Sequence, residues 1–113
     1  RIAQAAAELR DAMMAHPELV AGETRACTEL MRAAPGVALK TGAEAVFIAI
    51  IPNLRVGIAV KIEDGATRAS EALITALLIR LGVLQADHPA ALKRLGPIHN
   101  WDGLTTGKIS EIL

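Results

Sequence analysis

The chain has 113 residues, the length of one small domain, and 52% of them are apolar, so it can bury a core. Twelve basic residues balance twelve acidic ones, which leaves no electrostatic reason to expect nucleic acid or a membrane surface as a partner. One Trp, one Phe and no Tyr give few stacking surfaces for single-stranded nucleic acid. The single cysteine, Cys27, excludes an internal disulfide and favours a cytoplasmic location.

Apolar residues recur at helical spacing over residues 2–15, which predicts an amphipathic helix. Because the chain begins at Arg1, already inside this pattern, we interpret it as cut from a longer polypeptide. His16-Pro17 is predicted to end the helix, since the residue before a proline avoids helical geometry. Residues 17–23 are then expected to form a loop.

Thr24 is predicted to cap a second helix with its hydroxyl. The apolar face of that helix is expected to comprise Cys27, Leu30, Met31 and Ala34.

Strands are predicted next. Residues 37–40 suit a short strand, and residues 44–51 are nearly all apolar, which is typical of a strand buried on both faces. Residues 56–62 alternate between larger apolar and smaller or polar side chains, the period of a half-buried strand. With a turn over residues 52–55, the last two strands are expected to form an antiparallel hairpin.

Helical spacing returns over residues 66–81, and Gly82 is the expected stop. Asp87 and Pro89 suit the start of a short helix that runs to Leu95. A turn over residues 100–103 and a last strand over residues 109–113 complete the prediction. The expected fold class is α+β, with an antiparallel sheet flanked by helices, in a single domain or fragment spanning residues 1–113.

The cysteine and histidines give weak signals. Cys27 lies on the apolar face of a predicted helix, so a buried, inert thiol is favoured over a nucleophile. His16, His88 and His99 lack the spacing of a helical metal site, and capping or surface roles are expected. No metal ligand is assigned in the chain.

Lys40-Thr41-Gly42 is the strongest chemical signal. A lysine at a strand end, followed by a small hydroxyl residue and glycine, places an amine beside backbone that a substrate can approach. Serine hydrolases of the penicillin-recognising type use a strand with these three residues in this way. An exposed lysine at a sheet edge is the plain alternative. Farther along, Asp64 is as well suited to hold the start of a helix as to take part in catalysis.

Four segments in order resemble the C-terminal part of the rhizobial-type L-asparaginases: HPELVAG from residue 16, RACTELM from residue 25, KTGAE from residue 40 and VKIEDG from residue 60. The match runs through nearly the whole chain but covers about a third of a typical member. The residue after Ala43-Glu44 is often glycine in the family, whereas here it is Ala45, a change we expect to be conservative in a strand.

The resemblance implies a fold like that of serine β-lactamases and penicillin-binding proteins, and hydrolysis of L-asparagine to L-aspartate and ammonia. Lys40 matches the lysine that partners a catalytic serine. Cys27, Thr41 and Gly42 are candidate substrate contacts. The nucleophilic serine, its own lysine and the cysteines that bind zinc in some members would lie upstream, so this chain alone is expected to be inactive. A homo-oligomer, such as a dimer, is also expected.

An amide is a poor electrophile, so its hydrolysis needs an activated hydroxyl, an oxyanion site and a proton for the leaving ammonia. Lys40 can act as the base only where burial or a second ammonium makes it release its proton readily. Two alternatives stay open. The chain is a non-enzymatic interaction module, or it belongs to a hydrolase of the same fold whose substrate is glutamine, a β-lactam or another amide.

Overall fold

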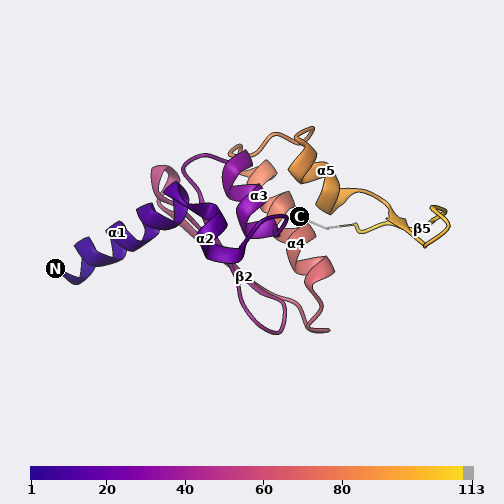
Figure 1. Cartoon of the computed structure of the whole chain (residues 1–113), viewed down its shortest axis with the longest axis horizontal. Coiled ribbons are helices and arrows are strands. Elements are labelled where there is room, and N and C mark those ends of the chain that lie inside the picture. The colour runs from indigo at the N-terminus through magenta and orange to yellow at the C-terminus, as the bar shows by residue number, and fades with distance from the viewer. Residues whose placement is uncertain (111–113) are drawn as a thin grey trace.

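The computed structural model describes residues 1–110, which form an elongated α+β molecule of 53 × 28 × 27 Å. Figure 1 shows a central body of helices and strands between two projections along the long axis. Helix α1 (Ile2–Ala15) forms one projection, and the small hairpin of β4 (Ile98–His99) and β5 (Thr105–Gly107) forms the other. The predicted fold class, helices around a small antiparallel sheet, is confirmed.

The sheet has the strand order β1-β2-β3, and both pairs are antiparallel. Its strands are β1 (Ala38–Thr41), β2 (Val46–Ile51) and β3 (Val56–Lys61), with a short 3-10 turn, η1 (Pro52–Leu54), between the last two. The predicted hairpin is therefore confirmed, and β1 is an edge strand.

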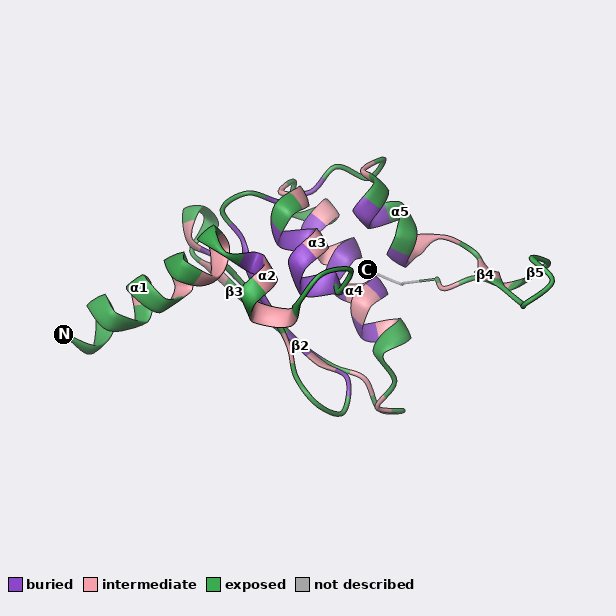
Figure 2. Ribbon diagram, in the orientation of Figure 1, coloured by how far each residue is buried: buried purple, intermediate pink, exposed green. Residues whose placement is uncertain are grey.

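The two faces of this sheet differ in burial. Leu39, Phe47 and Ala49 point inward and are at most 1% exposed, because α3 (Ala26–Ala33) and α4 (Thr67–Arg80) pack against them. Figure 2 shows these two helices as the most buried part of the molecule. Ile48 and Ile50 point the other way and are 38% and 40% exposed. The prediction that residues 44–51 are buried on both faces is thus wrong for the outer face.

Helix α3 buries the predicted apolar face, since Cys27, Leu30, Met31 and Ala34 are all at most 4% exposed. Its predicted cap is wrong. Thr24 has a φ of 66°, and the residue before the helix is Arg25, which makes no side-chain cap. The predicted loop over residues 17–23 is also partly wrong, because Pro17–Ala21 form helix α2. Proline has no amide hydrogen and a fixed φ, so it suits the first turn of a helix as well as the position after one.

Helix α4 ends as predicted at a glycine. Gly82 has a φ of 75°, and its N–H donates to Ile79 O while Val83 N–H donates to Leu78 O. This pair of bonds satisfies carbonyls that the last turn would leave without partners. Helix α5 (Pro89–Leu95) follows, and its N-cap is the His88 ring, which accepts the Ala90 N–H at 3.0 Å.

The C-terminal arm was only partly predicted. The turn over residues 100–103 is confirmed, but the β4–β5 pair that it joins was missed. Residues 109 and 110 are not in a strand, and the rest of the predicted last strand lies outside the described residues. Among residues 1–110, none of the helices combines the length and apolar character needed to cross a bilayer.

Candidate active site

The Lys40-Thr41-Gly42 segment lies where β1 ends, on the free edge of the sheet. Lys40 is exposed and belongs to the outer face, because its partner in the register is Ile48. Its Nζ donates a hydrogen bond to the Thr41 carbonyl. Within residues 1–110, no carboxylate lies within ion-pair distance of this ammonium.

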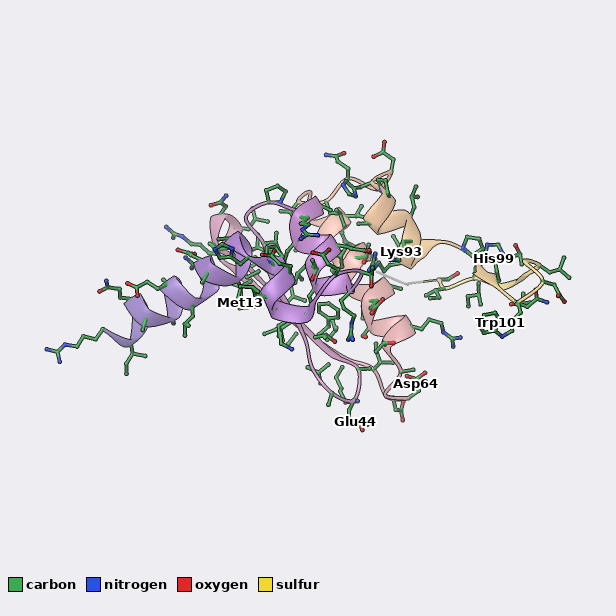
Figure 3. The ribbon with its side chains drawn as sticks, in the orientation of Figure 1. Met13, Glu44, Asp64, Lys93, His99 and Trp101 are labelled. Atoms are coloured by element: carbon green, nitrogen blue, oxygen red, sulfur yellow. The ribbon has the colours of Figure 1, made fainter. Side chains whose placement is uncertain are left out.

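A hollow of about 400 Å³ opens beside Lys40 on the outer face. Apart from the lysine, its walls are apolar: Met13, Val20, Ala38, Leu39, Ile48 and Ile50. Figure 3 places Met13 on the stretch of α1 nearest the body. The predicted amine therefore stands at the rim of an apolar surface and is not isolated in solvent.

Cys27 holds the end of β1 from the inner side. The sulfur is buried, with 1% of the residue exposed, and it accepts the Thr41 N–H at 3.2 Å. Thr41 N–H points away from β2 on the edge strand, so no sheet partner is present for it and the thiol satisfies it instead. The buried-thiol interpretation is confirmed. A direct contact between Cys27 and a substrate stays a prediction.

Gly42 carries the strand one step past the last paired residue, because its N–H donates to Val46 O at 2.8 Å. A Cβ at this position would lie 3.3 Å from Val46 Cβ, which is tighter than ordinary van der Waals contact. Glycine therefore keeps the surface open beside Lys40. Thr41 Oγ lies 3.5 Å from Val46 O, too far for a strong hydrogen bond, so that hydroxyl is only loosely held.

The turn that follows contains two residues in the left-handed region, Glu44 with a φ of 57° and Ala45 with a φ of 55°. Ala45 was expected to be a conservative replacement within a strand. That expectation is wrong, because Ala45 precedes β2 and adopts a conformation that favours glycine. A residue with a side chain is strained at this turn.

The described serines do not reach Lys40. Ser70 is fully buried in α4 and donates to Thr67 O at 2.9 Å, and Ser110 lies beside Ile62 and Leu73. Within residues 1–110, the Lys40 amine makes no hydrogen bond with any side-chain hydroxyl.

The remaining candidates have structural roles. Asp64 Oδ1 accepts the Ala66 N–H at 2.8 Å just before α4, so the helix-start interpretation is confirmed. Of the histidines, His88 caps α5 as described above, which confirms one capping role. The described part of the chain has no cluster of three or more His, Cys, Asp or Glu residues that fits a metal ion. Zinc bound by residues outside this chain stays a prediction.

One exposed cation of the outer face escaped the sequence prediction. Lys61 ends β3 on the same face as Lys40, and its Nζ donates to Ile62 O at 2.6 Å. The alternation over residues 56–62 indicates that Lys61 faces away from the core. Its relation to Lys40 depends on the register of three strands, which no local pattern provides.

A second hollow, of about 300 Å³, lies between α3 and α5 and is lined by Glu29, Arg32, His88, Pro89, Ala90 and Lys93, of which Glu29 and Lys93 form an ion pair. Glu29 binds Lys93 Nζ at 2.9 Å and also binds the buried Arg94. Burial raises the pKa of Glu29, but hydrogen bonds from Lys93 and Arg94 outweigh it and hold that pKa below its ordinary value. This cluster joins two helices and lies apart from the Lys40 strand end.

The family model for L-asparaginase II matches residues 1–111. The chain belongs to the L-asparaginase II family. None of the curated protein sequences compared with it matches. Family membership supports an asparaginase-type hydrolase and an amide substrate such as asparagine, whereas a fold like that of the serine β-lactamases stays a prediction.

Proposed function

We propose that this chain supplies the C-terminal part of the active-site domain of an L-asparaginase, with Lys40 as a catalytic base. The observation that carries the proposal is the position of Lys40 in a chain of this family. The amine is exposed at a strand end, has no carboxylate partner among the described residues and borders an apolar hollow.

The proposed chemistry gives Lys40 two proton transfers in each half of the reaction. In its neutral form, the amine takes the proton of a serine hydroxyl as the oxygen attacks the side-chain amide carbon of asparagine. The ammonium then protonates the leaving nitrogen, the C–N bond breaks and ammonia departs. Water then attacks the ester carbon while the same amine takes its proton, and the ammonium returns that proton to the serine oxygen as the C–O bond breaks, which releases aspartate and restores both the hydroxyl and the neutral amine.

The nucleophilic hydroxyl is proposed to come from outside residues 1–110, because Ser70 is buried and engaged with its own helix. This chain alone is then inactive. A polypeptide that carries the other catalytic groups would dock where Lys40 is exposed. Covering the outer face would also remove water from around the amine.

The surroundings support Lys40 by fixing the backbone on both sides of it. The Cys27 sulfur holds the Thr41 amide, and the Gly42 amide is bonded to Val46. Thr41 and Gly42 are proposed to contact the substrate because they flank the lysine on the open strand edge. We also propose a cytoplasmic homo-oligomer, with zinc, where present, bound by residues outside this chain.

The test is Lys40→Met in the asparaginase that contains this segment, with Lys108→Met, an exposed lysine of the C-terminal arm, as the matched control. We expect ammonia release from L-asparagine to fall by about 10³-fold or more for Lys40→Met, within the range for loss of a general base together with its nucleophile's activation. The control should keep the parent rate. Near-parental turnover in Lys40→Met, with its circular dichroism spectrum unchanged, would refute the assignment.

The non-enzymatic alternative rests on exposed apolar side chains such as Leu19 and Trp101, which are 81% and 105% exposed. Such surfaces also suit a part of a larger enzyme. Mixing this chain with the polypeptide that carries the serine distinguishes the two hypotheses, because only the asparaginase hypothesis predicts that ammonia release is restored. A panel of asparagine, glutamine and a β-lactam then decides among hydrolases of the same fold.

A further inference from the structure

Gly42, Val46 and Lys61 lie side by side across the outer face of the sheet. Gly42 is bonded through its N–H to Val46 O, and Val46 is the register partner of Lys61. Residues directly opposite one another in neighbouring strands project to the same face. Lys61 therefore projects from the same face as Lys40, which lies two residues before Gly42 on β1.

The distance between the two lysines follows from sheet geometry. Crossing two strand spacings and moving two residues along a strand separates the Lys40 and Lys61 backbones by roughly 12 Å. Each ammonium stands on a flexible four-carbon stem, so both can approach one small molecule from opposite sides. Between them on β2 lie Ile48, the register partner of Lys40, and Val46, the register partner of Lys61, while Gly42 adds no side chain beside Val46.

Both ammoniums are available for a ligand. Lys40 and Lys61 are exposed, and each donates to the carbonyl of the residue that follows it in the chain. Within the described residues, neither lies in an ion pair. Glu44, in the turn after Gly42, directs its carboxylate toward Gly65, where Oε2 would lie 3.1 Å from an added Cβ. Figure 3 shows Glu44 and Asp64 on two loops below the central body.

We infer that Lys61 is a specificity-determining residue that binds the α-carboxylate of the substrate, while Lys40 acts at the side-chain amide. The inference rests on the proposed function, since it requires Lys40 to mark the reacting end. In L-asparagine the α-carboxylate and the side-chain amide are at opposite ends of a short chain, which matches two cations on either side of the Ile48 and Val46 side chains. The substrate class is an amino acid amide with a free α-carboxylate.

The experiment compares L-asparagine with 3-aminopropanamide, which is the same molecule without its α-carboxylate. Both are assayed for ammonia release with the parent asparaginase and with Lys61→Met, Lys61→Arg and Lys108→Met. A charged hydrogen bond corresponds to about 10- to 100-fold in affinity. Lys61→Met should therefore lower kcat/KM for L-asparagine by that factor, mainly through KM, and leave 3-aminopropanamide unchanged. Lys61→Arg should keep most of the parental kcat/KM for L-asparagine. Lys108→Met should leave kcat/KM unchanged for both substrates.

The inference is overturned if Lys61→Met lowers kcat/KM equally for the two substrates, or lowers it for neither. These outcomes are distinct from failure of the proposed function, which appears as parental turnover in Lys40→Met. The substitution site is exposed, so loss of folding is not expected to interfere, and circular dichroism checks it for each variant.

Discussion

The two faces of the central sheet are built from the same kind of residue and end in different environments. On β2, Phe47 and Ala49 are buried beneath α3 and α4, whereas Ile48 and Ile50 are more than a third exposed. The inner face stabilises the body through packing. The outer face carries the two lysines and the apolar hollow, so it is where a further polypeptide or a substrate can act. Side chains on the inner face of the sheet thus contribute to stability, whereas those on the outer face carry the proposed chemistry.

The largest expected effect comes from the inner face. Phe47→Ala should lower the free energy of unfolding by about 3–5 kcal/mol, because it removes a fully buried ring and leaves a cavity. Ile48→Ala, at the next position on the same strand, should cost less than about 1.5 kcal/mol because Ile48 is 38% exposed. Urea denaturation followed by circular dichroism measures both. Equal losses would remove the distinction between the faces, and Phe47→Leu gives a milder test where Phe47→Ala fails to fold.

A medium effect is expected in the helical layer beneath the inner face. Glu29→Gln should lower the free energy of unfolding at pH 7 by about 1–3 kcal/mol, because it weakens charged hydrogen bonds to Lys93 and the buried Arg94. The folded-state pKa of Glu29 is lowered, so its contribution is present above the unfolded pKa of about 4.3 and is lost as the pH falls through the folded value.

The stability difference between the parent chain and Glu29→Gln should therefore shrink below about pH 5. Denaturation curves at a series of pH values measure this. Glu8→Gln, on the exposed helix α1, is the control and should show no difference at any pH. A difference for Glu29→Gln that stays constant down to pH 3 would contradict the ion-pair explanation.

The smallest effect is expected at the turn that connects β1 to β2. Ala45→Gly should raise the free energy of unfolding by up to about 1 kcal/mol, since glycine adopts a φ of 55° without strain and the loss of one buried methyl group offsets part of the gain. Ala43→Gly, two residues earlier and outside the left-handed region, should be neutral or destabilising. Thermal melts compare the two, and a lower melting temperature for Ala45→Gly would show that packing outweighs strain.

Much of the fold follows from local pattern. The alternation over residues 56–62 predicts the half-buried β3, and Gly82 predicts the end of α4. The errors have physical reasons. Pro17 both ends α1 and begins α2, and the burial of Ile48 depends on what covers the outer face, which local composition does not encode. The β4–β5 pair was missed because its strands have only two and three residues.

The candidate site was predictable only where local sequence pattern decides the structure. Lys40 could be placed at a strand end from its neighbours alone, and the structure agrees. Lys61 could not be related to it, because their common face depends on the register of β1, β2 and β3. The Cys27–Thr41 hydrogen bond joins a helix to a strand, and thirteen residues lie between the two in the sequence. It depends on how the helix packs against the strand, so no local sequence pattern predicts it.

The tip of the C-terminal arm has a practical consequence for spectroscopy. Asn100 Oδ1 accepts the N–H groups of Asp102 and Leu104 at 3.0 and 2.9 Å, so the tip holds a defined turn with Trp101 105% exposed. Trp101 is the sole indole of the chain, and tyrosine is absent. Trp101 fluorescence should therefore change little when the body unfolds. A blue shift of the Trp101 emission would instead report a molecule that binds to this arm and covers the indole.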